Sequence, residues 1–546
     1  MYMLTVVAFL SAFVSALERK AAAPIAVTPH VLKLVAAPHG HPVAPSTKHL
    51  ARRRESKTRR QDDAPTEDTS PSSNLPLPLH QALLTLGGRI YMTTVTLGSR
   101  PYTLVIDTGS SDTWIASSAF QCISPLTRDL LPQSSCGFGD LYMPEVSDTY
   151  TNISTHSFNV NYADGEFLSG EMGWEELGIG TGVGGAVLGG GDAVRGDSGG
   201  GLRVNQTIGV VTTGYWMGDR TSSGLMGLAY STLASNFRSM NYTSIIFTLF
   251  KDPSLPALFS LALSRPTPAS PIAGGLLAIG GIPDVPHDND FAIVPINPIF
   301  DDIYAFYAIP VDGFDISMPN KTAAGPRTKR DGEEGWDTPE GGDGVADLDE
   351  DEEAEVDMDE SEDEVQEERN QELSQEQDQT QDQPQNETAP LTTQNDTDTD
   401  PLPQSFSQYK NYPVSMIVDS GATLNYFPDA VASAIANAFS PPATYSVALN
   451  IYTVPCTALA PRVGVIIAGK TFFIHEADLM DRAVVVELGP KKDIGGGLTQ
   501  RERRCMVAMQ MQREADAVLG DAWLKGVLAV FDLGRDEMRF AGREEH

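Results

Sequence analysis

The sequence predicts a mostly β fold made of two related halves, and three observations support this prediction. From about Leu77 onward, short apolar runs rich in β-branched residues alternate with Gly, Pro, Asn and Asp, at the spacing typical of all-β proteins. The segments 104–111 (LVIDTGSS) and 416–423 (MIVDSGAT) each place an apolar strand before an Asp, a small hydroxyl residue and a Gly. About a hundred residues after each of them stands a matching element, at 224–228 and at 518–521. The chain therefore looks like a duplicated β unit.

The N-terminal segment, residues 1–16, predicts a signal peptide. It reads MYMLTVVAFLSAFVSA and ends in the small-residue pattern of a cleavage site, although its first residues lack Lys and Arg. The chain contains no apolar run of about 18 residues or more, so the sequence predicts no transmembrane helix. The C-terminal end, AGREEH, lacks the hydrophobic tail of a GPI signal. We therefore expect a secreted, extracellular protein without a membrane anchor, with a vacuole as the alternative location.

Residues 17–60 form a basic segment that ends in the dibasic pair Arg59-Arg60. Residues 1–60 carry 10 Lys and Arg against 2 acidic residues. A solvated linker and a nucleic-acid-binding arm are two interpretations of such a segment. Because it follows a signal peptide, we favour a third: a propeptide that a kexin-like processing protease removes after Arg60, so that the mature chain begins near Gln61.

The body of the chain is predicted to form two β lobes, an N-terminal one at 61–284 and a C-terminal one at 285–546. Strands are expected at 90–97, 102–106, 157–162 and 274–281, because these runs are apolar, β-branched and bounded by turn residues. One helix is expected to run to Phe439, with Asp429 as its N-cap.

Two low-complexity segments interrupt this body. Residues 178–201 are rich in Gly and predict a mobile insertion in the N-terminal lobe. Residues from about 317 to 408 are rich in Glu, Asp and Gln, and they cannot bury enough apolar surface to offset the entropy of ordering. Within them, residues 331–400 hold 29 acidic residues against one Arg, out of a net charge of -35 for the whole chain. The remaining body is still acidic, which argues against nucleic-acid binding.

The acidic insertion has two interpretations. It is either a solvated, disordered loop without function or a processing region, because the dibasic pair Lys329-Arg330 directly precedes the acidic run. Cleavage there would leave two chains held by the shared fold. The acidic run could also pair with the basic propeptide before maturation.

Asp107 and Asp419 are the candidate catalytic residues. A single Asp-[Ser/Thr]-Gly motif is a weak signal and commonly marks a turn at the end of a strand, but two such motifs behind apolar strands are a stronger one. A duplicated unit would bring one carboxyl group from each half face to face. Two such carboxyls share one proton, so that one activates a water molecule while the other polarises a carbonyl group. This chemistry hydrolyses amide bonds without a metal or a covalent intermediate.

These motifs resemble those of the pepsin-like aspartic proteases, and most closely the secreted fungal ones. The resemblance extends from about Leu77 to Ala541, outside the two insertions. It implies a bilobal fold with the active-site cleft between two pseudo-twofold-related β lobes, and an endopeptidase made as a zymogen. The enzyme would act at acid pH on polypeptide substrates, prefer large apolar residues around the scissile bond, and need neither a metal nor another cofactor. It would be a monomer. The alternative is a catalytically silent peptide-binding protein on the same fold.

The resemblance also assigns roles position by position. Asp107 and Asp419 match the catalytic pair, and the residues beside them match the groups that orient it: Thr108, Gly109, Ser110, Ser420 and Gly421. The substrate-binding flap matches residues 162–165, including Tyr162, Asp164 and Gly165, with Trp114 as the hydrogen-bond partner of Tyr162. The cysteines match two disulfides of the family, Cys122 with Cys136 and Cys456 with Cys505.

Three positions depart from the family or remain open. Ala422 stands where the family usually has Thr, whose hydroxyl donates to the aspartate; its loss predicts a higher pKa and a less acidic pH optimum. Ala163 replaces the more usual flap Gly. Asp164 is associated in fungal relatives with acceptance of Lys before the scissile bond, and an exposed turn Asp is the alternative interpretation.

Other motifs indicate secretion and exclude other enzyme classes. No Gly-X-Ser-X-Gly nucleophile motif occurs, no cysteines form a CxxC pair, and His475-Glu476 lacks the second His of a metalloprotease and predicts a surface turn. Six N-glycosylation sequons are present, at Asn152, Asn205, Asn241, Asn320, Asn386 and Asn395.

Overall fold

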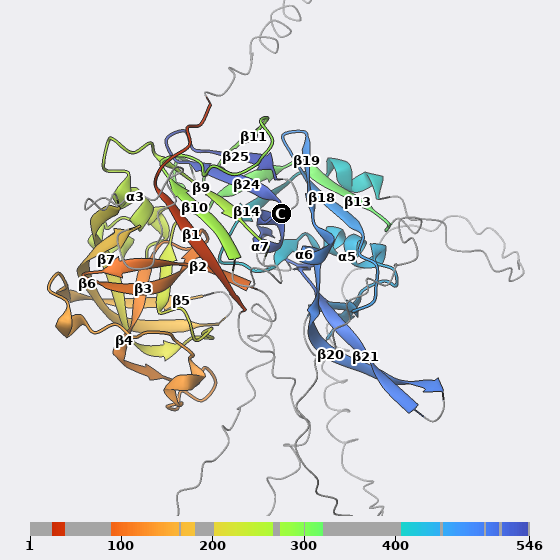
Figure 1. Cartoon of the computed structure of the whole chain (residues 1–546), viewed down its shortest axis with the longest axis horizontal. Helices are drawn as coiled ribbons and strands as arrows, with labels where there is room; N and C mark the ends of the chain where they lie inside the picture. Colours follow the sequence, from red (N-terminus) through yellow and green to blue (C-terminus); the bar gives the residue numbers. More distant parts are fainter. Residues whose placement is uncertain are drawn as a thin grey trace, which may run out of the picture. The chain divides into compact units, whose positions relative to one another are not determined.

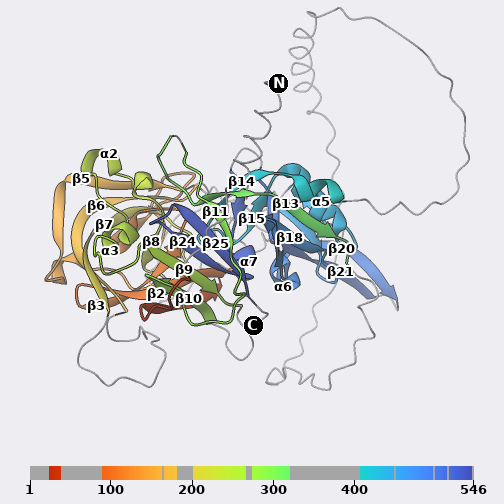
Figure 2. The same cartoon turned by 90° about the horizontal axis from the view of Figure 1, so that it is seen from above.

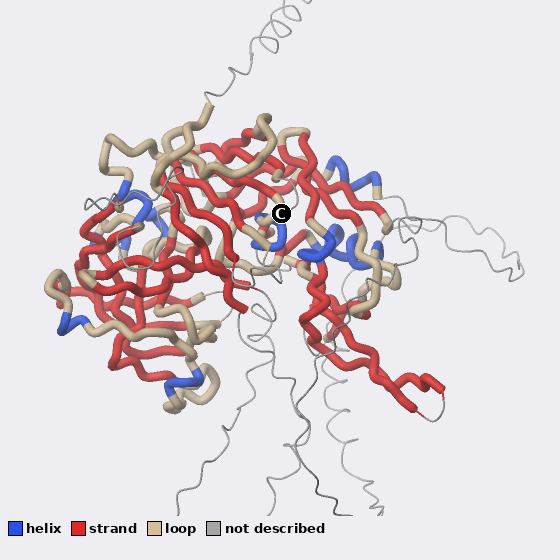
Figure 3. The backbone as a smooth tube through the Cα atoms, in the orientation of Figure 1, coloured by secondary structure: helices blue, strands red, loops and turns tan. Residues whose placement is uncertain are grey.

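Strands dominate the described part of the chain (Figures 1 and 3), so the mostly β prediction is confirmed. The computed structural model describes residues 24–38, 89–162, 165–180, 201–265, 273–299, 301–319, 406–447, 451–495, 498–512 and 516–543. The chain divides into two compact units, Met1–Asn320 with Ser405–His546 and Lys321–Gln404, and every described residue belongs to the first.

The largest sheet has 13 strands and joins residues from both ends of the chain. Apolar side chains of its strands form most of the core of the N-terminal half. Its strand order is β11 (Ala292–Pro295), β25 (Glu537–Gly542), β24 (Val527–Asp532), β9 (Leu258–Leu263), β10 (Ala273–Ile279), β1 (Val31–Pro38), β2 (Arg89–Leu97), β3 (Arg100–Asp107), β8 (Gly224–Gly227), β4 (Thr113–Cys122), β7 (Leu202–Tyr215), β6 (Phe167–Ile179) and β5 (Thr151–Asn161).

Three smaller sheets make up the C-terminal half. Figure 2 shows their strands on the opposite side of β9, β24 and β25 from β5, β6 and β7. One sheet has the order β12 (Ala308–Val311), β14 (Val414–Val418), β23 (Val518–Leu519), β15 (Asn425–Phe427), β22 (Met509–Met511); another β13 (Gly313–Ser317), β18 (Arg462–Ile467), β19 (Lys470–Ile474); and the third β16 (Thr444–Ser446), β17 (Ile451–Pro455), β21 (Leu498–Val507), β20 (Met480–Gly495).

The helices are short and lie between strands. The α-helices are α2 (Phe237–Met240), α3 (Ile245–Leu249), α5 (Asp429–Ala438), α6 (Glu476–Leu479) and α7 (Asp521–Leu524), and the 3-10 helices are η2 (Gln133–Ser135), η3 (Pro144–Val146), η4 (Ser231–Leu233) and η5 (Ser407–Asn411).

The two halves repeat one strand arrangement around the two aspartates. In the first half, β3 pairs in parallel with β8, and β8 pairs antiparallel with β4. In the second half, β14 pairs in parallel with β23, and β23 pairs antiparallel with β15. The elements matched in the sequence, at 224–228 and 518–521, are therefore the ones that flank the two Asp-bearing strands. This confirms the duplicated β unit.

Aromatic side chains join the two halves. The rings of Phe259 and Phe531 stack with centroids 4.4 Å apart, and Tyr307 packs edge-on against Phe531 at 4.7 Å. The Tyr307 hydroxyl donates to the Leu228 carbonyl at 2.5 Å. Because these groups are fully buried, they fix the first half against the second close to the strands that lead to Asp107 and Asp419.

Strand β1 corrects one interpretation of the basic N-terminal segment. Residues 31–38 pair antiparallel with β10 on one side and with β2 on the other. Val31, Leu32, Leu34 and Ala36 are buried. This part of the segment is an inner strand of the 13-stranded sheet, so a solvated linker is the wrong description of it.

Several predicted boundaries need smaller corrections. Gly178 and Ile179 still belong to β6, where they pair with Arg203 and Leu202, so the Gly-rich insertion begins later than residue 178. Ser317 ends β13, and η5 already begins at Ser407, so the acidic insertion is narrower than 317–408.

The predicted N-cap Asp429 and the predicted surface turn at His475-Glu476 also need correction. Asp429 is the first residue of α5, and its N-cap is Pro428, whose backbone is not helical (φ -48°, ψ 139°). His475 is the N-cap of the short helix α6 rather than a surface turn, since its ring Nδ1 accepts a hydrogen bond from the Ala477 N–H at 3.1 Å.

Candidate active site

Asp107 and Asp419 each stand where an apolar strand ends in a tight turn. Asp107 is the last residue of β3, and Asp419 directly follows β14. In the first turn the Gly109 N–H donates to Asp107 Oδ1 at 2.7 Å, and in the second the Gly421 N–H donates to Asp419 Oδ1 at 2.8 Å. The same local hydrogen bond therefore orients both carboxyl groups.

Thr108 and Ser420 link the two turns by reciprocal hydrogen bonds. The Thr108 N–H donates to Ser420 Oγ at 3.2 Å, and the Ser420 N–H donates to Thr108 Oγ1 at 2.9 Å. Each hydroxyl also donates into the opposite strand: Thr108 Oγ1 to the Val418 carbonyl at 3.0 Å, and Ser420 Oγ to the Ile106 carbonyl at 3.2 Å. Because both side chains are buried, this network fixes the separation of the two aspartates.

The glycines of the two motifs make room for the opposite carboxyl group. A Cβ atom on Gly109 would lie 2.5 Å from Asp419 Oδ2, and a Cβ atom on Gly421 would overlap Asp107 Oδ1. Any larger residue at either position would push the two acids apart. The structure thus brings Asp107 and Asp419 face to face.

The two carboxyl groups differ in their surroundings. The Ser110 hydroxyl donates to Asp107 Oδ2, whereas Ala422, at the matching position of the second turn, has no hydroxyl to donate to Asp419. Loss of hydration and the negative charge of Asp107 raise the pKa of Asp419 well above its ordinary value, and its backbone N–H donors only partly oppose this.

Asp521 is a third buried carboxyl group beside the dyad, and the sequence analysis missed it. It begins α7, and its N–H donates to the Ala422 carbonyl at 2.8 Å. Neither carboxyl oxygen has a hydrogen-bond partner among the described residues. Burial raises its pKa well above the ordinary value; Lys525 opposes this rise, and the negative charges of Asp419 and Asp107 add to it. The segment 518–521 had been matched only as an apolar element, although its Asp was a visible signal.

The flap residue Tyr162 is held by Trp114. Trp114 Nε1 donates to the Tyr162 hydroxyl at 2.7 Å, as the resemblance implied. The hairpin closes through Tyr162 N–H to the Glu166 carbonyl at 2.9 Å and Gly165 N–H to the Tyr162 carbonyl at 3.1 Å. Gly165 has a φ of +92°, which favours glycine. Burial and the negative charge of Asp107 raise the pKa of Tyr162 well above its ordinary value. Asp164 lies outside the described residues.

Asp112 is a buried acid that directly follows the first motif, residues 104–111. The sequence pattern did not indicate a role for it. It accepts hydrogen bonds from the Ser235 N–H at 2.9 Å, from the Ser235 hydroxyl at 3.3 Å and from the Tyr242 hydroxyl. Burial raises the pKa of Asp112 from 3.8 to about 6, against the opposing effect of the Ser235 hydrogen bonds.

We expect Asp112 to make the protein less stable as the pH rises from about 4 to about 6. The native state keeps this proton to a higher pH than the unfolded state, so the stability due to it is complete below pH 3.8 and is lost as the pH rises through 6. At ~1.4 kcal/mol per pKa unit the loss is about 3 kcal/mol. Urea unfolding at several pH values, in an Asp107→Asn background that prevents self-digestion, should show this slope. Asp112→Asn should reduce the slope by this contribution, since Asp419 and Asp521, whose pKa values are also raised, still contribute to it. Equal slopes in the two proteins would contradict the expectation.

The disulfides pair as the resemblance implied. Cys122 is joined to Cys136, and Cys456 to Cys505. Among the sequons, Asn152, Asn205 and Asn241 are exposed. The remaining predicted sites lie outside the described residues: Asn320, Asn386, Asn395, Arg59, Arg60, Lys329 and Arg330.

The described residues include neither a metal-binding cluster of side chains nor a helix suited to a membrane. No group of three or more His, Cys, Asp and Glu side chains in this part of the chain is arranged to hold a metal ion. Among the helices of the described ranges, none has both the length and the apolar character needed to cross a membrane.

Comparisons with known proteins agree with the geometry. The family model for eukaryotic aspartyl protease matches residues 90–187 and 402–543. The chain is 30% identical to a probable aspartic-type endopeptidase of Aspergillus fumigatus over 449 residues, which cover 80% of this chain and 75% of the relative. Shorter matches include the probable aspartic-type endopeptidase OPSB of Arthroderma benhamiae, 27% identical over 25% of this chain and 27% of the relative. Secreted aspartic protease 6 of Candida albicans is 36% identical over 14% of this chain and 18% of the relative.

Proposed function

The chain belongs to the eukaryotic aspartyl protease family and is an aspartic-type endopeptidase; from this premise we propose that Asp107 and Asp419 together activate the water molecule that attacks the peptide bond. The observation that carries the proposal is the reciprocal Thr108–Ser420 network, which holds one carboxyl group from each half against the other. In this arrangement the two carboxyl groups titrate as a pair with two apparent pKa values. At pH values between these two, the pair holds a single proton.

The surroundings of the two acids suggest how they divide the work. Asp107 accepts hydrogen bonds from Ser110 and Gly109, while the raised pKa of Asp419 favours its protonated form. Asp107 would then take a proton from the attacking water as Asp419 donates a hydrogen bond to the scissile carbonyl. The resulting tetrahedral intermediate breaks down when a proton passes to the leaving amine, and the dyad returns to its starting state.

Cleavage of a denatured protein at acid pH, with and without pepstatin, tests this function. Pepstatin-sensitive cleavage by the matured protein supports it. The alternative, a silent peptide-binding protein on the same fold, draws its support from the missing hydroxyl at Ala422. Pepstatin binding without any cleavage would favour that alternative.

Ala422 is expected to shift the pH dependence of activity. In Ala422→Thr the added hydroxyl can donate to the charged form of Asp419, which lowers the apparent pKa values of the dyad. Both limbs of the kcat/KM profile should therefore move to lower pH, by up to about one unit. Ala422→Ser tests the same donor without the methyl group, and an unchanged profile in both variants would contradict the expectation.

We also propose that the enzyme prefers large apolar residues around the scissile bond and accepts Lys before it through Asp164. Tyr162, which is close to Asp107, and the neighbouring Trp216 supply an aromatic surface, and the fully buried Trp114 packs against Trp216. We expect Asp164→Ala to lower kcat/KM for a Lys peptide roughly tenfold relative to a norleucine peptide. An equal change for both peptides would leave Asp164 without this role.

Maturation and location are further parts of the proposal. Residues 1–16 would act as a signal peptide and residues 17–60 as a propeptide of a secreted zymogen, with a vacuole as the alternative location. The two lobes would meet near residue 285. Cleavage after Arg330 would leave two chains, which a denaturing gel of the deglycosylated mature enzyme would separate into two bands. The match to secreted fungal relatives supports the secreted location.

A further inference from the structure

The loop between β7 and β8, residues 216–223, is attached to the loop of the first disulfide. The Gly218 N–H donates to the Cys136 carbonyl at 3.2 Å, and the Arg220 N–H donates to the Gly137 carbonyl at 2.6 Å. A Cβ atom on Gly218 would overlap the Gly137 carbonyl, so the two backbones are in close contact. This side of the β7–β8 loop is therefore fixed by backbone contacts.

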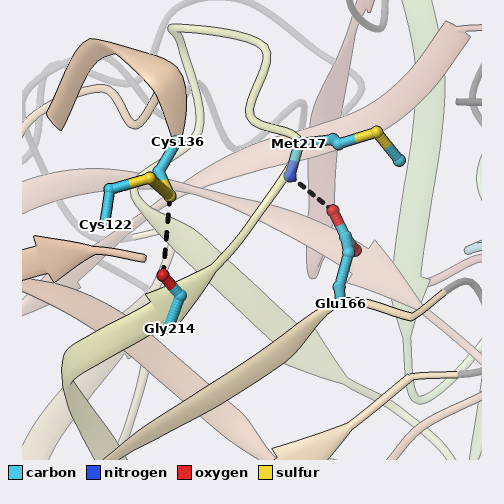
Figure 4. Close-up of a disulfide and its surroundings, with 5 residues drawn as sticks. All are labelled: Cys122, Cys136, Glu166, Gly214 and Met217. Atoms are coloured by element: carbon cyan, nitrogen blue, oxygen red, sulfur yellow. Dashed lines mark hydrogen bonds between the residues drawn. A yellow bond between two sulfur atoms is a disulfide. The ribbon is translucent and has the colours of Figure 1, made fainter. Parts of the chain in front are cut away.

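A carboxyl group, that of Glu166, attaches the other side of the β7–β8 loop to the flap. Glu166 lies between the flap turn and β6, and its side chain is only 4% exposed. Its Oε1 accepts a hydrogen bond from the Met217 N–H at 2.5 Å (Figure 4). In the same view, the disulfide lies at the end of β7, where Cys136 Sγ contacts the Gly214 carbonyl at 3.7 Å.

Trp216, the residue before Met217, packs among the aromatic groups beside the dyad. Its ring lies 4.9 Å from that of Trp114 and 5.8 Å from that of the flap residue Tyr162, and it stacks on Phe138 at 6.4 Å. Its indole Nε1 has no hydrogen-bond partner among the described residues. Ring packing and the backbone on either side of Trp216 thus determine where it lies, and the Met217–Glu166 hydrogen bond fixes that backbone on one side.

We infer that Glu166 is a positioning residue that ties the flap to the β7–β8 loop and so sets the aromatic surface that receives the side chain before the scissile bond. The inference rests on the proposed protease function. The preferred side chain is a large aromatic or apolar one, because Trp216 and Tyr162 offer aromatic rings to it, while the fully buried Trp114 packs against Trp216 and supports this surface. Glu166 acts through the position of its acceptor oxygen and does not contact the reacting atoms.

The test compares two peptides, with Phe or Ala before the scissile bond, across variants of Glu166. Glu166→Gln keeps an acceptor oxygen at the same reach and should stay within about twofold of the wild type for both peptides. Glu166→Asp keeps the charge but is one methylene shorter, and Glu166→Ala removes the acceptor. Both should lower kcat/KM roughly tenfold for the Phe peptide and less than twofold for the Ala peptide. The matched control is Glu171→Ala, an exposed acid on β6, which should change neither value.

Each other result would overturn the inference. Equal losses for both peptides would indicate a general structural role, and a Gln variant that behaves like the Ala variant would indicate a role of charge. Because Gln and Asp keep a polar group of similar size, they decide the matter even if Glu166→Ala does not fold. If the wild type cleaves neither peptide, this result contradicts the proposed protease function and leaves the role of Glu166 to be tested by binding. Pepstatin binding, followed by Trp fluorescence, then decides the role of Glu166: a roughly tenfold weaker affinity in Glu166→Asp supports it, and equal affinities overturn it.

Discussion

Asp107→Asn is expected to lower kcat by about 10³- to 10⁴-fold, because the amide cannot accept the proton of the attacking water. The substitution preserves size: the amide oxygen of Asn can accept from the Gly109 N–H, and its NH2 group can donate to the Ser110 hydroxyl, which accepts instead of donating. The fold and the binding of pepstatin should therefore survive while hydrolysis is lost. The assay is cleavage of a peptide with a large apolar residue before the scissile bond, at the acid optimum of the wild type.

Asp140→Asn is a suitable control for Asp107→Asn, since Asp140 is an exposed acid and no role in the site is assigned to it. Its activity should match that of the wild type. If Asp107→Asn keeps a tenth or more of the wild-type kcat, the assignment of Asp107 as general base is wrong. If Asp107→Asn no longer binds pepstatin, the substitution has disturbed the site itself, and Asp107→Ala with the same binding assay would then separate structure from chemistry.

Thr108→Val is expected to lower both stability and activity. The Thr108 hydroxyl accepts from the Ser420 N–H and donates to the Val418 carbonyl, and Val leaves both of these buried groups unpaired. The cost should be about 3 kcal/mol of unfolding free energy. Because the network sets the separation of the two aspartates, kcat should also fall roughly a hundredfold. Urea unfolding and steady-state kinetics measure the two effects.

Two variants serve as controls for Thr108→Val. Thr108→Ser keeps the hydroxyl and should recover most of the activity. Ser260→Ala removes a buried hydroxyl on β9 that donates to the Gly281 carbonyl at 2.9 Å and takes no part in the Thr108–Ser420 network. It should cost about 1 kcal/mol and leave kcat unchanged. A Thr108→Val enzyme with the wild-type kcat would show that the network is not needed to position the dyad.

The sequence was sufficient to predict that Asp107 and Asp419 come together, because the signal is local. An apolar strand, an Asp and a tight turn occupy eight consecutive residues, and the same pattern occurs twice. The partner strands could also be predicted, since the second elements repeat as well. The Tyr162–Trp114 contact came from the resemblance, because nothing in the sequence between these two residues indicates that they meet.

The acids that the sequence did not reveal depend on distant parts of the chain. Asp112 is five residues from Asp107, but its partner Ser235 is 123 residues away. Asp521 lies beside the dyad because its N–H bonds to the carbonyl of Ala422, in the second turn. Glu166 is tied to the β7–β8 loop by the N–H of Met217. Strand β1 was overlooked for a similar reason: its short apolar run is outweighed by the basic residues that follow, and only pairing with β10 and β2 makes it a strand.

The place of β1 has a consequence for maturation under the proposed cleavage after Arg60. The cut would break one peptide bond, yet the ladders to β10 and β2 would still hold the severed segment in the sheet. Cleavage of the peptide bond and dissociation of the severed segment are thus two events with separate rates. The first rate depends on the processing protease, and the second on how fast the hydrogen bonds of an inner strand break. A nicked, non-covalent complex would stand between precursor and enzyme, and its lifetime would be a property of the sheet rather than of the protease that made the cut.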